Sequence, residues 1–64
     1  MPNFKSQYEA RYKASSEAIE FQTYFSLSHK SAIKKAKKTA IKNNTLLNGV
    51  YYFNDVNFTL NKIY

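Results

Sequence analysis

The sequence predicts an α+β fold, in which an antiparallel sheet of three or four strands packs one face against a single helix in the order β-β-α-β(-β). In residues 4–14 and 19–27, apolar and polar side chains alternate with a period of two, which is typical of a strand with one buried face. Residues 28–44 place alanines at helical spacing, and residues 49–61 alternate again. With 64 residues, positions 1–64 form a single domain around one small core.

The first two strands are expected to form a hairpin with both apolar faces on the helix side. A four-residue loop at 15–18 predicts the pairs Tyr12 with Phe21, Tyr8 with Phe25 and Lys13 with Glu20. A two-residue loop at Ser15-Ser16 is the competing register, and it pairs Arg11 with Glu20 instead. Both registers bury Phe21 and Phe25 against the helix.

A helix is expected to begin after Ser28, because a serine hydroxyl can accept from the backbone N–H groups of the first turn. Its core-facing residues are Ala32, Ile33, Ala36 and Ala40, which fall within about 100° of arc. Asn43, Asn44 and Thr45 are poor helix formers, so we place the end near Asn44. The alternative is a longer helix that includes Leu47 and ends at Gly49.

The C-terminal residues read as a second hairpin, with Asn54-Asp55 as a two-residue turn that pairs Phe53 with Val56. A single long strand with a bulge at this point is the alternative. The pairs further from the turn are Tyr51 with Phe58 and Gly49 with Leu60. The core expected from the three strand segments consists of Phe4, Tyr8, Tyr12, Phe21, Phe25, Tyr51, Phe53 and Phe58.

Composition argues against several classes of protein. The chain has no cysteine and no apolar stretch near the ~20 residues of a membrane span, and its first residues do not resemble a signal peptide. We therefore expect a cytoplasmic protein. His29 near the helix start is more typical of a surface residue than of a catalytic base, and the four carboxylates form no metal-binding pattern. We expect no enzymatic activity, no metal, no cofactor and no small-molecule substrate.

The charge is concentrated in the predicted helix. The chain has ten Lys and Arg against four Asp and Glu, and six of the lysines lie in the helix with no acid between them. Lysines without arginine favour contacts with backbone phosphates over the reading of bases. A solvated face is the alternative, although solubilising helices usually alternate their charges. The candidate contact residues are Lys30, Lys34, Lys35, Lys37, Lys38, Ile41 and Lys42, with Ile41 as an apolar anchor.

A second candidate surface is the outer face of the sheet. Basic residues interleaved with tyrosines resemble a platform on which unpaired bases stack. Tyrosine is also common on exposed strands for packing reasons, and two glutamates dilute the charge, so we rank this surface below the helix. Binding to a membrane surface is disfavoured, because the apolar side of the helix is needed for the core. The secondary candidates are Lys5, Arg11, Lys13, Tyr24 and Tyr52.

The run 21–40, FQTYFSLSHKSAIKKAKKTA, combines a strand, a serine cap and an alanine-spaced helix. It resembles modules of two kinds of small protein: phage-encoded anti-CRISPR inhibitors with a β-β-α-β core, and archaeal ribosomal proteins of split β-α-β type. The resemblance covers about a third of the chain. It implies a binding protein that occupies a nucleic-acid channel or PAM-reading surface of an effector complex, and it transfers no individual site residue.

Three function classes follow from these patterns. The first is an anti-CRISPR-like inhibitor from a phage or mobile element, which blocks the nucleic-acid-binding surface of a host defence complex through the lysine-rich helix. The second is a protein that binds DNA or RNA directly, with little sequence preference, through the phosphates. The third is a structural or antitoxin-like subunit, which would use an unpaired strand edge for assembly.

Overall fold

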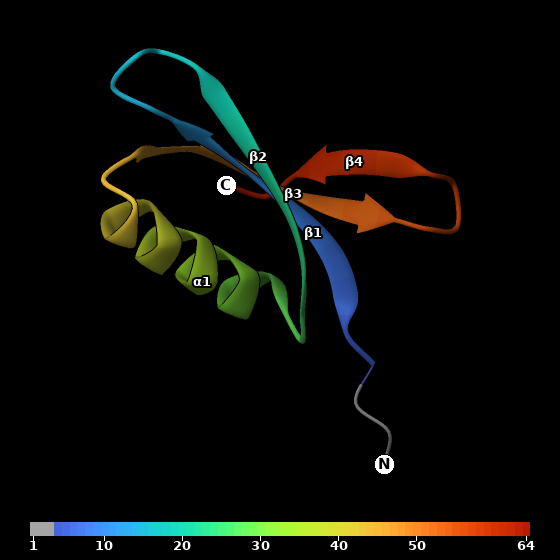
Figure 1. Cartoon of the computed structure of the whole chain (residues 1–64). Helices are drawn as coiled ribbons and strands as arrows, with labels where there is room; N and C mark the ends of the chain where they lie inside the picture. Colours follow the sequence, from blue (N-terminus) through green and yellow to red (C-terminus); the bar gives the residue numbers. More distant parts are fainter. Residues whose placement is uncertain (1–3) are drawn as a thin grey trace.

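The computed structural model describes residues 4–64 and confirms the predicted α+β fold with four strands and one helix in this range (Figure 1). The elements are β1 (Ser6–Lys13), β2 (Ile19–Ser26), α1 (His29–Lys42), β3 (Leu46–Asn54) and β4 (Thr59–Lys62). The sheet has the order β2-β1-β3-β4, and every neighbouring pair is antiparallel. Consequently β2 and β3 run parallel on either side of β1, and α1 connects them across one face of the sheet.

Helix α1 begins and ends close to where the sequence predicts. The Ser28 hydroxyl accepts a hydrogen bond from the Ser31 amide at 3.1 Å, which satisfies one of the free N–H groups of the first turn. The helix ends at Lys42, and Asn44 adopts a left-handed conformation with φ 55°, which asparagine tolerates well. The longer alternative is wrong, because Leu47 and Gly49 belong to β3. Within residues 4–64, no helix is long and apolar enough to cross a membrane.

The core lies between α1 and the two central strands. It consists of Tyr8, Ala10, Tyr12, Ala32, Ala36, Ala40 and Val50, with Tyr24, Ile33, Leu47 and Ile63 packed at its margin. The three alanines of α1 are small, so the helix axis can lie close to the tyrosines of the sheet. This confirms the predicted inward face of the helix and the predicted burial of Tyr8 and Tyr12.

Each tyrosine of this core also has a partner for its hydroxyl group. Tyr12 donates to the side-chain oxygen of Gln22 at 2.6 Å, and Tyr24 donates to the carbonyl oxygen of Ala32 at 2.6 Å. The Tyr8 hydroxyl lies 2.8 Å from Nδ1 of His29. Burial raises the pKa of Tyr24 to about 12 and also raises the pKa values of Tyr8 and Tyr12, because the charged phenolate is disfavoured away from water.

The register of the β1–β2 hairpin differs from both predicted registers. The Ala14 amide donates to the Ala18 carbonyl at 2.9 Å, which leaves a three-residue loop in which Glu17 is left-handed with φ 67°. An odd loop length shifts the pairing by one residue, and such a shift turns every side chain of the strand to the other face. The observed pairs include Tyr8 with Tyr24, Ala10 with Gln22 and Arg11 with Phe21.

In most of strand β3, the side chains that face α1 are also the ones expected on the opposite face. Tyr8 pairs with Tyr52 and Ala10 with Val50, so the even-numbered residues of β3 face α1 in this stretch. A bulge at Asn48 then restores Leu47 to the helix side. Most of the expected core is therefore wrong: Phe4, Phe21, Phe25 and Phe58 are exposed, and Tyr51 and Phe53 are only partly buried and face away from α1.

The β3–β4 connection is a hairpin, as predicted, but with a longer loop. Asn54 pairs with Thr59 and Phe53 with Leu60, so the predicted partner Val56 lies in the turn. The Asn54 side-chain oxygen accepts from the Val56 amide at 2.9 Å, and Phe58 is left-handed with φ 55°. This side-chain hydrogen bond stabilises a turn after Asn54, so Asn54 ends β3 and the loop comprises residues 55–58.

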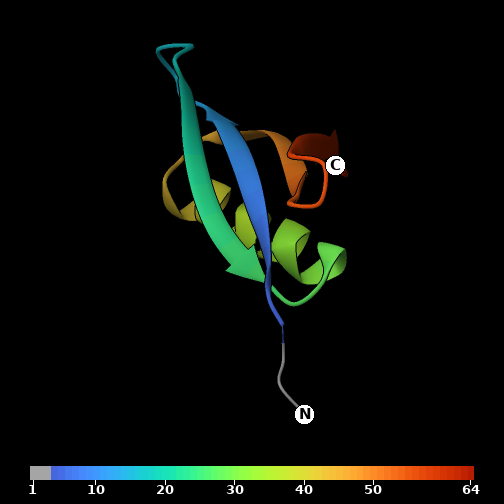
Figure 2. The same cartoon turned by 90° about the vertical axis from the view of Figure 1, so that its right-hand side faces the viewer.

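Because α1 covers only one face, the opposite face of the sheet is open among residues 4–64 (Figures 1 and 2). We call it the open face. The side chains that the register places on it are Gln7, Glu9, Arg11, Lys13, Ile19, Phe21, Thr23, Phe25, Leu46, Tyr51, Phe53, Leu60 and Lys62. Several are large apolar residues that remain exposed, which in a small domain is typical of an interaction surface.

Candidate functional site

The first candidate surface is the outward side of α1, which we call the lysine face. It consists of Lys30, Lys34, Lys35, Lys37, Lys38 and Lys42, all exposed. The sequence of α1 contains no acidic residue. Within residues 4–64 the ion pairs are Arg11 with Glu9 at 2.8 Å and Lys13 with Glu17 at 3.9 Å, so no carboxylate lies within 4.0 Å of a lysine of this face.

The lysine face is long, and its side chains make weak contacts with the rest of the molecule. From Lys30 to Lys42 the helix rises roughly 18 Å, at about 1.5 Å per residue. Nζ of Lys35 lies 3.4 Å from the Phe25 carbonyl oxygen, and Nζ of Lys37 lies 4.7 Å from the centre of the Tyr64 ring. These are weak contacts for an ammonium group, so the charges of this face are available to a partner.

One apolar residue interrupts the lysine face. Ile41 is 82% exposed near the end of α1, between the positions of Lys38 and Lys42. A second apolar element is a shallow hollow on the side of the helix, lined by Lys30, Ile33, Lys34 and Lys37. The aliphatic stems of the lysines can cover such a surface while the charged heads remain in water.

The secondary candidates do not come together as predicted. Arg11 and Lys13 lie on the open face, and Lys5 is exposed just before β1. Tyr24 and Tyr52 lie on the opposite side, facing α1. The Tyr24 hydroxyl is bound to Ala32, and the Tyr52 ring lies 5.6 Å from that of Tyr8 and 5.0 Å from that of His29. Their prediction as outward-facing stacking residues is wrong, because it assumed the other register for β2 and β3.

Other aromatic side chains occupy the place predicted for Tyr24 and Tyr52. The guanidinium carbon of Arg11 lies 5.4 Å from the ring centre of Phe21 on β2 and 4.2 Å from that of Tyr51 on β3. Arg11 Nε donates to the Glu9 carboxylate at 2.8 Å, and this hydrogen bond is the main reason that the Arg11 pKa is raised. The result is a cation held between two rings, which favours the charged form and fixes the rings.

Gly49 allows this arrangement. It lies opposite Arg11, and a Cβ atom at this position would come within 3.1 Å of the Tyr51 ring. Such a contact is tighter than ordinary van der Waals packing, so a side chain here would push the ring away from Arg11. The absence of a side chain lets Tyr51 lie across the strand beside the guanidinium.

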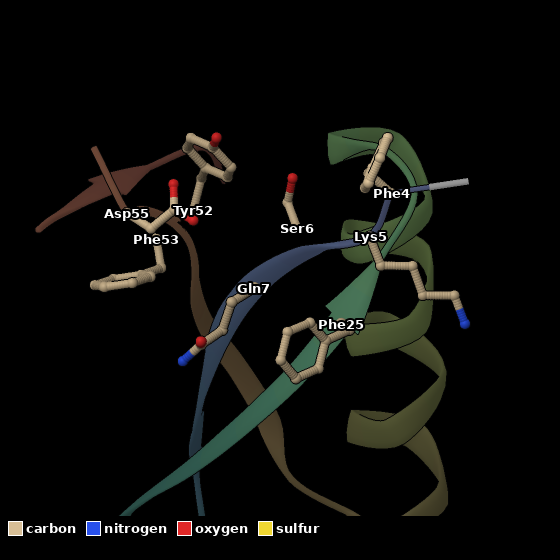
Figure 3. A pocket seen from close by; sticks show the side chains of 8 residues that line it. All are labelled: Phe4, Lys5, Ser6, Gln7, Phe25, Tyr52, Phe53 and Asp55. Carbon is tan, nitrogen blue, oxygen red and sulfur yellow. The ribbon is translucent and has the colours of Figure 1, made fainter. Parts of the chain in front are cut away.

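A hollow of about 290 Å³ lies at the edge of the open face, between the start of β1 and the part of β3 that extends beyond its last pair with β1 (Figure 3). Figure 3 shows Gln7 between Phe25 and Phe53, with its amide group projecting between the two rings. The lining is completed by Phe4, Lys5, Ser6, Tyr52 and Asp55. An amide carries both donors and an acceptor, so this hollow offers hydrogen bonds beside two aromatic rings.

The sequence did not indicate these aromatic residues, because the predicted registers turned the opposite faces of β2 and β3 toward α1. The Ser15-Ser16-Glu17 segment between Ala14 and Ala18 fits a three-residue loop as well as the two expected loops, so the sequence does not decide between them. With a three-residue loop, Phe21 of β2 lies opposite Arg11 of β1, as observed.

The titratable side chains form no cluster that would suggest a metal site: within residues 4–64 no three His, Asp or Glu residues gather in one place. His29 contacts Tyr8 and Tyr52, and its Nδ1 is engaged by the Tyr8 hydroxyl. Comparisons with protein-family models, with curated proteins and with solved structures find no match for this chain. The lysine face and the open face are the candidate functional surfaces among residues 4–64.

Proposed function

We propose that this protein is a non-enzymatic binding protein that contacts the backbone phosphates of a nucleic acid through the lysine face of α1. The observation that carries the proposal is the gathering of six exposed lysines along one helix with no carboxylate within 4.0 Å among residues 4–64. Neutralising a phosphate with a lysine releases condensed counterions, which gives affinity without sequence preference.

The distribution of charge supports a specific role for this face. The formal net charge is +6, and the six lysines of α1 account for all of it. The other basic residues, Lys5, Arg11, Lys13 and Lys62, are balanced by Glu9, Glu17, Glu20 and Asp55, so that four minus four gives zero. A chain that needed charge only for solubility would gain as much from an even distribution, whereas a concentrated field attracts a polyanion.

The type of residue indicates how the nucleic acid would be bound. The face contains no arginine, so it lacks the planar, bidentate donors that read guanine. Lysine acts as a point charge on a flexible stem and suits phosphates at varied positions. We therefore expect this face to bind duplex and single-stranded molecules alike.

The test is a charge reversal with a matched control. The variant Lys34→Glu, Lys37→Glu, Lys38→Glu brings the formal net charge from +6 to zero, and so does the control Lys5→Glu, Lys13→Glu, Lys62→Glu. Binding of a labelled DNA duplex, followed by fluorescence anisotropy, should be much weaker in the first variant and retained in the second. The slope of log K against log salt should fall by about three in the first variant. Equal losses in both folded variants would mean that net charge alone matters.

Exposed Ile41 favours a second candidate function, an anti-CRISPR-like inhibitor that acts on a host defence complex in the cytoplasm. An apolar residue surrounded by lysines suits the surface of a protein that also carries acidic groups or bound nucleic acid. Inhibition of DNA cleavage by a purified RNA-guided nuclease would then depend on Ile41, and Ile41→Ser would abolish it while leaving duplex binding unchanged. Undiminished inhibition by Ile41→Ser would contradict this role for the residue.

A further inference from the structure

The open face carries a second arrangement that the lysine face does not explain. Arg11 lies at its centre, between Phe21 on β2 and Tyr51 on β3, at 5.4 and 4.2 Å from the two ring centres. Among residues 4–64, its hydrogen-bond partner is Glu9, to which Nε donates. The remaining N–H donors of the guanidinium are free for a ligand that carries oxygen acceptors.

The rings beside Arg11 are accessible from solvent. Phe21 is 64% exposed and Phe25, on the same strand and the same face, is 56% exposed. The two residues are four positions apart, which corresponds to roughly 13 Å along a strand. Exposed rings on a rigid sheet present flat surfaces on which another flat, aromatic group can stack without displacing the core.

The charge of the open face indicates which partner fits. The basic residues on it or at its end are Lys5, Arg11, Lys13 and Lys62, against the acidic residues Glu9 and Asp55 and against Glu17, which pairs with Lys13. This surplus complements a polyanion. A second copy of the chain docked on the same face would bring two such basic surfaces together, in addition to the +6 charge that each copy carries.

The geometry points to the open face as a binding site for single-stranded nucleic acid, with unpaired bases stacked on Phe21 and Phe25 and oxygen atoms of the strand held by Arg11. The hollow between Phe25 and Phe53 provides a place for one base beside the Gln7 amide (Figure 3). Its volume of about 290 Å³ is close to the roughly 300 Å³ at which small-molecule sites begin. Duplex DNA has no unpaired base to offer, so this site selects single strands.

This inference rests on the proposed function in one respect, that the partner is a nucleic acid. Figure 2 shows α1 on one side of the sheet. The lysine face belongs to α1, and the register places the stacking residues on the face of the sheet away from α1. Variants of the two surfaces can therefore be tested separately. A loss of stacking affects single strands only, whereas a loss of phosphate contacts on α1 affects single strands and duplexes.

The experiment uses three labelled probes: an oligothymidylate of about twelve nucleotides, an abasic oligomer of the same length, and a duplex. The abasic oligomer keeps the phosphates and removes the bases. Wild-type protein should bind the oligothymidylate at least about fivefold more tightly than the abasic oligomer, which is the lower limit for one stacked base. The double variant Phe21→Ala, Phe25→Ala should bind both single-stranded probes equally and should bind the duplex as the wild type does.

Two further variants serve as controls for the chemistry. Leu46→Ala removes an exposed apolar side chain from the other end of the open face and should leave the preference for bases intact. Phe21→Leu keeps an apolar side chain without a flat ring, and it should lose about as much affinity for the oligothymidylate as Phe21→Ala. Circular dichroism checks that each variant is folded, which is expected because the substituted side chains are exposed.

Each remaining outcome would overturn the inference. Equal affinity of the wild type for the oligothymidylate and the abasic oligomer, with the duplex still bound, would remove the stacking site and leave the proposed function in place. No binding to any of the three probes would remove both. A dimer in sedimentation experiments that Phe21→Ala dissociates would assign the open face to a second copy of the chain.

Discussion

Two neighbouring residues of β2 should respond very differently to truncation. Tyr24 packs against the core, and its hydroxyl donates to Ala32 at 2.6 Å, whereas Phe25 lies on the open face and is 56% exposed. In either register expected from the sequence, the roles are reversed, with Phe25 in the core. Tyr24→Ala and Phe25→Ala therefore test which face of β2 is buried, and with it the position of Phe21.

The structure sets the size of the expected difference. Complete burial of a large apolar side chain contributes about 1.5–3 kcal/mol. Since less than half of Phe25 is buried, its removal should lower the free energy of unfolding by about 1 kcal/mol. Removal of the Tyr24 ring and its hydrogen bond should cost about 3 kcal/mol. A chain of 64 residues has a total stability of roughly 3–10 kcal/mol, so this loss is large.

Urea unfolding followed by far-UV circular dichroism measures both variants. If Tyr24→Ala is unfolded without urea, Tyr24→Phe gives a milder comparison, because it removes only the hydroxyl and should cost about 1 kcal/mol. A Phe25→Ala variant that loses as much stability as Tyr24→Ala, or more, would refute the observed register. It would also place Phe25 and Phe21 in the core and exclude them as stacking residues.

Two further predictions concern the N-cap of α1 and the partly buried Tyr24. Ser28→Ala removes the acceptor for the Ser31 amide and should cost about 1 kcal/mol, a fall of roughly 4–8 °C in Tm; an unchanged melting curve would contradict the role of this cap. The pKa of Tyr24 is raised to about 12, so the folded state keeps a proton that the unfolded state releases from about pH 10. Stability should therefore be complete below about pH 10 and fall as the pH rises through about 12, and Tyr24→Phe should reduce this fall in urea titrations at each pH.

Local patterns made the helix and the strand segments predictable. Ser28 and the spacing of Ala32, Ala36 and Ala40 act within a few turns, and the observed helix follows them. The inward face of β1 was predictable as well, because its other face carries charged residues. The composition of the lysine face follows from the helical period alone, which explains why the sequence places its six lysines and Ile41 correctly on the surface.

The pairing of the strands was less predictable, because it depends on loops and on distant partners. The three-residue loop decides which side chains of β2 face α1, and it requires Glu17 to adopt a left-handed conformation. This conformation favours glycine or asparagine, so a glutamate at this position does not indicate such a loop. In β3, the run from Val50 to Phe53 is apolar on both faces, and only pairing with β1 decides which residues are buried. The aromatic surface around Arg11 depends on both choices and could not be located from the sequence.

The salt dependence of duplex binding by the wild-type protein tests whether the lysine face binds backbone phosphates. If about four lysines of the lysine face neutralise phosphates, log K should fall against log salt with a slope of about −3.6. Affinity measured by fluorescence anisotropy should then fall about 150-fold between roughly 50 and 200 mM salt. No saturable binding at the lowest salt, or an affinity that does not change with salt, would contradict the assignment of the lysine face to phosphate binding.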